Sequence, residues 1–318
     1  MTELKAFFLV GPTATGKTAV SQWIAERHSG DILSADAMMV YRGMNIGTAK
    51  PDMALRNKVR YWGLDLVAPS DTFSVGQYHR HALSAVREAL MSGRRIIVAG
   101  GTGLYVKSLT HGLSRLAAGN PDIRKKADEL LQRSGIGALQ EWVKSQAPKQ
   151  YESMADKNNP RRLVRVMETA HCSAREKNNL WRPLGKGPVI AGLMMPRNLL
   201  YERIKERVKE MYSAGLLEEV ERLLKQGFSA SGGETAPTAG KAIGYAEATL
   251  VLRGKIIIDD AMEITIKRTC QLAKRQMTWF RNQANVDWVE IDSGMTTEQI
   301  ARMVLACWKK IGPTPIAP

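Results

Sequence analysis

The sequence contains no long apolar run and few cysteines. No stretch of eighteen consecutive apolar residues occurs, so a membrane-spanning helix is not expected. The first five residues lack the charged-then-apolar layout of a secretory signal, which favours a soluble, cytoplasmic protein without a membrane partner. The three cysteines form neither a C-x-x-C pair nor a metal-binding spacing, so we expect buried thiols.

Acidic residues are also scarce relative to basic ones. The chain has 31 Asp and Glu against 46 Lys and Arg, a formal net charge of +15. A net charge far from zero opposes compaction, so this excess points to a polyanionic partner larger than one phosphate. Nucleic acid is the favoured partner, and a generic basic surface that serves solubility is the alternative. With 318 residues, 44% of them hydrophobic, the chain can form one large domain and a smaller one.

The most informative motif comes directly after the apolar residues 7–10. The pattern G-x-x-x-x-G-K-[ST] is filled at every position, by Gly11, Pro12, Thr13, Ala14, Thr15, Gly16, Lys17 and Thr18. In this pattern the backbone N–H groups of a glycine loop and of the following helix N-terminus surround phosphate oxygens. Residues 19–27 supply the helical pattern that must follow. The sequence therefore predicts a site for a phosphate-bearing ligand.

The first 110 or so residues alternate between strand and helix patterns. Short apolar runs at 6–10, 31–34, 61–67 and 95–99 are separated by segments long enough for helices, such as 75–91. This alternation predicts an α/β fold in which helices flank a parallel sheet. Ligands bind outside the carboxyl ends of the strands in such sheets. We therefore expect the loops after the first, second and fourth strands to meet at one site.

The middle of the chain shows no strand pattern. Helical patterns begin near residue 120, at 137–145 and at Pro160, and a glycine-rich turn follows at 185–188. After this turn the patterns predict a strand at 189–195, helices at 199–214, 216–225 and 259–282, and a strand at 286–291. The predicted domains are thus a P-loop core of residues 1–113 and 187–318 and a smaller all-helical insertion of residues 114–186.

A carboxylate follows the second predicted strand. Asp36 can orient Mg²⁺, accept a proton from a nucleophile or cap the next segment. A P-loop nucleoside triphosphatase needs an acid at the end of a core strand, but the fourth strand leads into Gly100, Gly101 and Thr102. Asp259 follows a run of isoleucines, yet we expect it to be a helix N-cap. The loop thus lacks obvious machinery for ATP hydrolysis, which favours pyrophosphate as a leaving group.

Two basic clusters suit a nucleic acid. The predicted helix 259–282 contains cations, an amide and aromatic side chains, which suit phosphate contacts and base stacking: Lys274, Arg275, Gln276, Trp279, Phe280 and Arg281. Trp279 can alternatively belong to the core-facing stripe of this helix. The second cluster, in the predicted insertion, comprises Arg161, Arg162 and Arg165, for which a solvated charged face is the alternative.

Together these segments resemble the tRNA dimethylallyltransferase family, also called the tRNA isopentenyltransferases. The most specific matches are residues 46–51 (Ile-Gly-Thr-Ala-Lys-Pro) and 273–276 (Ala-Lys-Arg-Gln), and further matches are spread over most of the chain. The resemblance implies transfer of a dimethylallyl group from dimethylallyl pyrophosphate to N6 of the adenosine 3′-adjacent to the tRNA anticodon. It also implies Mg²⁺ as cofactor and a P-loop core with a helical insertion. We expect a monomer that binds the anticodon stem-loop.

The resemblance assigns roles to individual residues. Asp36 becomes the general base on N6, and Thr102 hydrogen-bonds near the reacting centre. The pyrophosphate ligands become Gly11, Thr13, Ala14, Thr15, Gly16, Lys17, Thr18 and Arg207, with Thr18 also on Mg²⁺. The tRNA contacts become Ala37, Met38, Met39, Arg124, Arg161, Arg162, Arg165, Lys241, Gly244, Tyr245, Lys274, Arg275, Gln276, Trp279 and Arg281.

The sequence departs from the family pattern at Thr15, Ala37, Ala246 and residues 172–175, and none of these positions is a proposed catalytic group.

Three other functions stay open. An adenylate isopentenyltransferase acting on free AMP needs neither the insertion nor the basic clusters. A P-loop small-molecule or nucleotide kinase needs an arginine-bearing lid that the sequence does not reveal. A non-catalytic RNA-binding protein with a vestigial loop does not need Lys17 and Asp36 to be intact.

Overall fold

The computed structural model describes residues 3–113, 120–154, 156–170, 186–230 and 238–318. These residues divide into two units, which we describe separately. One unit holds 3–113, 186–230 and 238–318, and the other holds 120–154 and 156–170. No helix within these ranges combines the length and apolarity that crossing a bilayer requires. Residues 172–175 and the start of the turn predicted at 185–188 lie outside the described residues.

The first unit is built on a seven-stranded sheet with the strand order β3-β2-β4-β1-β5-β6, with β7 paired to β1. Its strands are β1 Lys5–Val10, β2 Gly30–Ser34, β3 Tyr61–Trp62, β4 Arg95–Gly100, β5 Val189–Met194, β6 Asn285–Glu290 and β7 Thr314–Pro315. All pairings are parallel except β1 with β7. The predicted parallel sheet is confirmed, and β1 lies in its buried centre.

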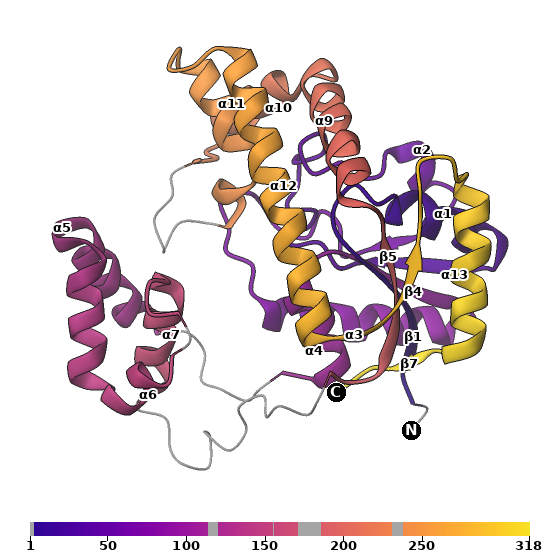
Figure 1. The fold of residues 1–318 in the computed structure, drawn as a ribbon, viewed down its shortest axis with the longest axis horizontal. Helices are drawn as coiled ribbons and strands as arrows, with labels where there is room; N and C mark the ends of the chain where they lie inside the picture. Colours follow the sequence, from indigo (N-terminus) through magenta and orange to yellow (C-terminus); the bar gives the residue numbers. More distant parts are fainter. Residues whose placement is uncertain (1–2, 114–119, 155, 171–185, 231–237) are drawn as a thin grey trace. The chain divides into compact units, whose positions relative to one another are not determined.

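Helices cover both faces of this sheet (Figure 1). Helices α1 and α13 pack together on one face, and α3 and α4 pack together on the other, where α4 also contacts α12. The α-helices of this unit are α1 Lys17–Arg27, α2 Met53–Arg56, α3 Val75–Met91, α4 Gly103–His111, α9 Arg197–Ser213, α10 Leu216–Lys225, α11 Tyr245–Leu252, α12 Ile258–Gln283 and α13 Thr297–Ile311. A short 3₁₀ helix, η1, covers Thr238–Lys241.

Two local predictions are wrong. The strand predicted at 61–67 ends after Trp62, because Gly63 and Asp65 have φ values of 79° and 54° and turn the chain out of the extended conformation. Asp259 is not the N-cap of α12, since that position belongs to Ile257. The carboxylate lies in the first helical turn instead, where it interacts favourably with the positive end of the helix dipole.

The described part of the predicted insertion consists of helices: α5 Pro121–Gln146, α6 Pro148–Glu152 and α7 Pro160–Ala170. Helix α5 is interrupted at Gly135, whose φ of 70° is not helical. The unit has a hydrophobic core of its own, formed by Ala127, Leu139, Val143, Leu163, Val164 and Met167. Its apolar side chains are thus buried within the unit itself.

Candidate active site

The phosphate loop connects the central strand β1 to helix α1. Three of its residues have positive φ: Gly11 at 143°, Ala14 at 65° and Gly16 at 84°. A Cβ atom on Gly11 would lie 2.5 Å from the carbonyl oxygen of Leu193, so a side chain does not fit there. Gly16 is the N-cap of α1 and makes no side-chain cap. The first N–H groups of the helix can therefore bind an anion.

Two side chains hold the loop in this shape. Thr15 Oγ1 and Lys17 Nζ both donate to the carbonyl oxygen of Pro12, at 2.9 and 2.6 Å. Thr15 is 0% exposed, so its hydroxyl shapes the loop and does not reach a ligand. Burial lowers the pKa of Lys17 from 10.5 to about 7; Asp36 opposes this shift, and Arg207 adds to it. A bound pyrophosphate supplies the negative charge that this ammonium lacks.

The ends of β2 and β4 are joined next to the loop. Thr102 Oγ1 accepts a hydrogen bond from the Ala37 N–H at 3.0 Å, and the Thr102 N–H donates to the Ala35 carbonyl at 3.0 Å. Asp36 Oδ1 accepts from the Met38 N–H at 2.8 Å. The capping role left open for Asp36 is thus present. The hydrogen bond from Met38 uses one carboxylate oxygen of Asp36 and holds the Asp36 side chain beside Thr102.

Gln276 of α12 joins the phosphate loop to the end of β4. Its Oε1 accepts from the Thr13 N–H at 2.8 Å, and its Nε2 donates to the Gly101 carbonyl at 3.0 Å. A Cβ on Gly101 would collide with this amide, and one on Gly100 would collide with the backbone of Ala35. The glycines that replace the acid of a nucleoside triphosphatase are therefore required by close packing.

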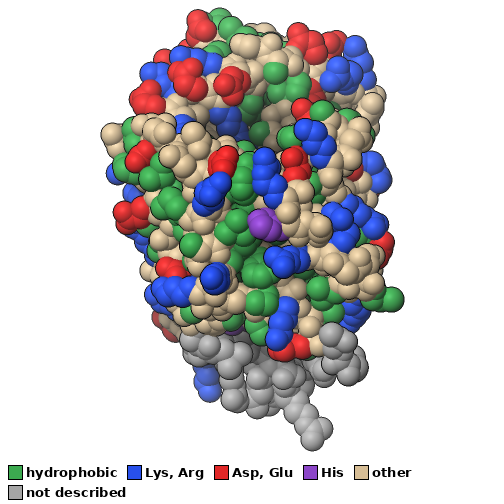
Figure 2. Space-filling view, turned by 90° about the vertical axis from the view of Figure 1, so that its right-hand side faces the viewer, with side chains coloured by type: hydrophobic (Ala, Val, Ile, Leu, Met, Phe, Trp, Pro, Cys, Tyr) green, Lys and Arg blue, Asp and Glu red, His purple; other side chains and the backbone are tan. Residues whose placement is uncertain are grey.

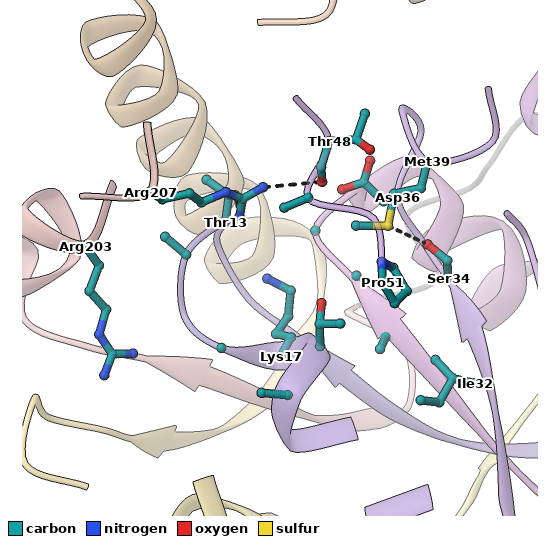
Figure 3. Close-up of a pocket in the computed structure, with 18 of the residues that line it drawn as sticks. Thr13, Lys17, Ile32, Ser34, Asp36, Met39, Thr48, Pro51, Arg203 and Arg207 are labelled. Carbon is teal, nitrogen blue, oxygen red and sulfur yellow. Dashed lines mark hydrogen bonds between the residues drawn. The ribbon is translucent and has the colours of Figure 1, made fainter. Parts of the chain in front are cut away.

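Arg207 reaches the same place from α9. Its Nη1 donates to Thr13 Oγ1 at 3.1 Å and its Nη2 to the Thr48 carbonyl at 3.3 Å. Burial lowers the pKa of Arg207, and the nearby Asp36 counteracts that effect. Lys17, Asp36 and Arg207 thus come from three different elements and lie around one cavity (Figure 3).

Two cavities meet at these residues. The first, of about 710 Å³, is lined by the phosphate loop, the ends of β2 and β4, and α9. The second, of about 470 Å³, is lined by residues after β2 and by η1 and α12. Both are lined by Thr13, Asp36, Thr48, Arg207 and Gln276. One carboxylate therefore faces two ligand spaces at once.

The predicted pyrophosphate ligands largely gather in the first cavity. Its lining includes Thr13, Ala14, Gly16, Lys17, Thr18 and Arg207. Gly11 and Thr15 shape the loop from behind instead. The predicted catalytic Thr102 lines the second cavity. The loops after β1, β2 and β4 thus meet at one site, as predicted from the parallel sheet.

The surroundings of Thr18 suit a metal ion that arrives with a phosphate. Thr18 is half-buried and lines the first cavity. Among the residues that the structure describes, no three Asp, Glu, His or Cys side chains group as a metal site. Mg²⁺ prefers oxygen ligands and is commonly held by one or two side chains together with substrate phosphates. The residues present therefore fit Mg²⁺ as a companion of pyrophosphate.

The residues predicted to contact tRNA fall into several places in the first unit. Ala37, Met38, Lys241 and Arg275 line the second cavity, whereas Met39 lines the first. Lys274 and Arg281 are exposed and line a separate groove of about 450 Å³ between α9 and α12. The predicted contacts therefore include both the second cavity and the outer surface of α12.

Trp279 fulfils the packing role that the sequence left open. It is half-buried, and its ring lies edge-on to that of Phe280 with 5.2 Å between the ring centroids. A Cβ on Gly103 would collide with the indole. It also lines a surface depression together with Lys274 and Arg275. One edge of the indole thus supports the helix packing, and the ring still borders the basic surface.

Tyr245 lies inside the fold. Its side chain is 0% exposed and its hydroxyl donates to Glu219 Oε1 at 2.6 Å. Gly244, with φ of 93°, is the N-cap of α11, and its N–H donates to Glu247 Oε2 at 2.8 Å. The contact predicted between tRNA and Tyr245 therefore does not rest on its side chain, which is buried against other residues of the core.

The four arginines predicted in the insertion differ in their surroundings. Arg124 Nε and Arg165 Nη1 donate to the carboxylate of Glu168, at 2.8 and 2.9 Å. Glu168 is buried, so this carboxylate orients two cations without reaching solvent. Arg161 and Arg162 are exposed on α7.

Basic side chains are not confined to these places. On the face of the molecule that carries α13, Lys and Arg side chains are spread among apolar ones rather than gathered in one patch (Figure 2). The generic basic surface considered as an alternative therefore describes this face. It does not account for the basic residues that line the cavities.

Sequence reasoning missed Arg203 at the site, the structural role of Gln276, and the buried Glu219 behind the site. Arg203 lines the first cavity one helical turn before Arg207. Gln276 was assigned to tRNA, whereas its amide joins two loops of the core. Glu219 holds the segment before Thr48. The i,i+4 spacing of the two arginines could have revealed Arg203.

This fold and this site define an α/β protein of the P-loop class, with a carboxylate between a phosphate cavity and a second ligand cavity. The model of the family described as IPP transferase matches residues 39–283. The chain belongs to this family of prenyl-transferring enzymes. A tRNA dimethylallyltransferase of Pelotomaculum thermopropionicum is 35% identical over 304 residues, which cover 94% of this chain and 95% of the relative. One from Acetivibrio thermocellus is 36% identical over 300 residues, covering 92% and 94%.

Solved structures of related proteins are consistent with this family membership. The tRNA isopentenylpyrophosphate transferase of Bacillus halodurans superposes with a TM-score of 0.66 at 31% identity, over 97% of this chain and 98% of that one. A eukaryotic dimethylallyltransferase acting on tRNA gives a TM-score of 0.71 at 19% identity, over 96% and 76%. The second likeness shows the shared fold alone.

Proposed function

We propose that the protein transfers a dimethylallyl group from dimethylallyl pyrophosphate to N6 of the adenosine 3′-adjacent to a tRNA anticodon and releases pyrophosphate. The observation that carries this proposal is the position of Asp36 between the two cavities. The phosphate loop selects the first cavity for the donor, which leaves the second for the adenine. The family and the relatives described above support the same reaction.

The donor's pyrophosphate lies against the N-terminus of α1, Lys17 and Arg207. As the bond between C1 of the donor and its oxygen breaks, negative charge grows on the leaving pyrophosphate. Fixed cations and N–H groups bind that charge more tightly in the transition state than in the ground state. Mg²⁺, held by Thr18 and the phosphates, supplies further charge neutralisation when bound.

The acceptor side is served by Asp36 and Thr102. An exocyclic adenine amine is a weak nucleophile, so it must be aligned with C1 and lose a proton as the new C–N bond forms. Asp36 accepts this proton, and the Thr102 hydroxyl, which lines the same cavity, orients the amine. Positioned acid–base catalysis of this kind contributes about 10²- to 10⁴-fold to the rate.

The tRNA is bound largely through phosphate contacts from exposed arginines and lysines. The reacting base leaves its stack to enter the second cavity, at a cost of a few kcal/mol. Contacts between these basic side chains and the tRNA phosphate backbone offset this cost. We infer that the enzyme acts as a monomer in the cytoplasm, because tRNA itself supplies the partner surface.

A labelling assay with tRNA tests this proposed function. Purified protein with Mg²⁺ and radiolabelled dimethylallyl pyrophosphate is expected to label unmodified tRNA, and nuclease digestion is expected to place the label on N6 of one adenosine. Labelling of free AMP in preference to tRNA would overturn the proposal in favour of an adenylate isopentenyltransferase. Phosphoryl transfer from ATP would overturn it in favour of a kinase.

A further inference from the structure

A buried carboxylate holds a loop that borders both cavities. Glu219 of α10 is 2% exposed. Its Oε2 accepts from the N–H groups of Asn45 at 3.1 Å and Ile46 at 2.9 Å, and its Oε1 from those of Ile46 at 3.1 Å and Gly47 at 3.4 Å. Three successive backbone donors thus converge on one side chain, an arrangement that stabilises a buried carboxylate.

Tyr245 completes this arrangement. Its hydroxyl donates to Glu219 Oε1 at 2.6 Å. The ring lies so close to Gly47 that a Cβ there would collide with it. Glu219, Tyr245 and Gly47 are therefore fitted to one another, and the residues 45–48, which we term the 45–48 loop, have little freedom to shift.

The loop ends at a residue that touches the proposed pyrophosphate ligands. The Thr48 carbonyl accepts from Arg207 Nη2 at 3.3 Å. Arg207 Nη1 donates to Thr13 Oγ1 at 3.1 Å, so the loop, α9 and the phosphate loop are connected through this guanidinium. Thr48 and Arg207 both line both cavities.

We propose that Glu219 is a positioning residue for the donor site: it fixes the 45–48 loop so that the Thr48 carbonyl holds Arg207 against the pyrophosphate. The inference rests on the proposed function in one respect, namely that Arg207 binds pyrophosphate. Glu219 itself touches neither cavity. Its effect is transmitted by the backbone of three residues and one guanidinium.

Glutamine is the appropriate replacement, because it preserves the shape of the side chain and removes its charge and one acceptor oxygen. The amide then turns a donor toward N–H groups or toward Tyr245, and the loop loses part of its anchor. The neighbouring Glu218 is exposed on the same helical turn. Glu218→Gln therefore makes the same chemical change at the surface and is the matched control.

The experiment measures binding of inorganic pyrophosphate with Mg²⁺ by calorimetry, without tRNA. Glu219→Gln is expected to raise the Kd about tenfold, the size of effect typical for a lost hydrogen bond to a charged group. Glu218→Gln is expected to leave it unchanged. In steady-state assays Glu219→Gln raises the KM for dimethylallyl pyrophosphate, and the KM for tRNA stays near that of the wild type.

A double-mutant cycle separates positioning from a general loss of structure. If Glu219 acts through Arg207, then Glu219→Gln has little further effect on pyrophosphate binding in an Arg207→Met background. Equal effects in both backgrounds would overturn the inference, and so would unchanged binding in the single variant.

Tyr245→Phe keeps the ring and removes only the hydroxyl, so it is a milder second variant should Glu219→Gln fail to fold. It is also expected to raise the Kd for pyrophosphate, and an unchanged Kd would count against the inference. Wild-type protein that fails to bind pyrophosphate would instead contradict the proposed function.

Discussion

Gln276 accepts a hydrogen bond at 2.8 Å from the backbone N–H of Thr13, a residue 263 positions earlier in the chain. Through its other amide atom it also donates to the Gly101 carbonyl at 3.0 Å. The phosphate loop is thus held by a helix formed near the end of the sequence. This relationship gives Gln276 a structural role, as a support of the phosphate loop, in addition to the predicted contact with tRNA.

The first prediction concerns this glutamine. Gln276→Leu removes both hydrogen bonds of the amide, so the KM for dimethylallyl pyrophosphate is expected to rise by up to about thirtyfold, since each neutral bond contributes roughly 1 kcal/mol. Filter-binding affinity for tRNA is expected to change less. The exposed Gln226, changed to Leu, serves as control. A variant that loses tRNA affinity and keeps the wild-type KM for the donor would contradict this structural role and favour the tRNA contact alone.

The second prediction concerns the proposed general base. Asp36→Asn retains the hydrogen bond from the Met38 N–H and cannot accept a proton, so kcat is expected to fall by about 10²- to 10⁴-fold. Binding of donor and of tRNA is expected to stay near wild-type values. The exposed Asp292, changed to Asn, is the control. Turnover within tenfold of the wild type would show that Asp36 is not the base.

The third prediction is a pH dependence of donor binding. Burial lowers the pKa of Lys17 from 10.5 to about 7, and a bound pyrophosphate raises the pKa again. Binding therefore takes up a proton, and the Lys17 contribution to affinity, complete below pH 7, is lost as the pH rises above that value. Calorimetry at pH 8 in two buffers of different ionisation enthalpy measures this uptake. Lys17→Arg, whose guanidinium stays charged, is expected to abolish it; equal uptake in the two proteins would contradict the assignment.

The fourth prediction concerns tRNA. When a protein binds several phosphates, the logarithm of its association constant for tRNA falls linearly with the logarithm of the salt concentration. Arg162→Ala is expected to weaken binding and to reduce the magnitude of that slope by about one, as for the loss of one phosphate contact. Arg302→Ala is the control, because Arg302 lies on α13 and is paired with Glu298. A slope that is flat in the wild type would argue against the basic clusters as a tRNA surface.

The site could be predicted from the sequence where its residues lie next to strand ends. The loop from Gly11 to Thr18 and the carboxylate of Asp36 follow strands β1 and β2 directly, and parallel strands deliver such residues to one edge of the sheet. The pattern G-x-x-x-x-G-K-[ST] predicted part of the local backbone as well, since the positive φ values at Gly11 and Gly16 suit glycine.

The supports of the site could not be predicted in this way. Gln276, Glu219 and Tyr245 act through contacts across large sequence separations, and no local pattern encodes those. Glu219 does leave a trace, because it shares the buried face of α10 with Leu216, Val220 and Leu223. An acid in an apolar stripe must find hydrogen-bond donors when it is buried. Which donors it finds depends on the tertiary fold.

The strand predicted at 61–67 failed for a related reason. Its aromatic and aliphatic residues have strand propensity, but Asp65 is drawn into ion pairs with Lys50 at 2.8 Å and Arg56 at 2.7 Å. These ion pairs, with residues 15 and 9 positions earlier in the chain, outweigh the strand propensity of the segment.

The bond between Gln276 and Thr13 also bears on the order in which the enzyme becomes competent during synthesis. Ribosomes produce the chain from the N-terminus at about 5–20 residues per second. The phosphate loop therefore emerges long before α9 and α12, which carry Arg207 and Gln276. A nascent chain that already contains the whole phosphate loop still lacks the side chains that hold it, so the proposed donor site is complete only after α12 has been made.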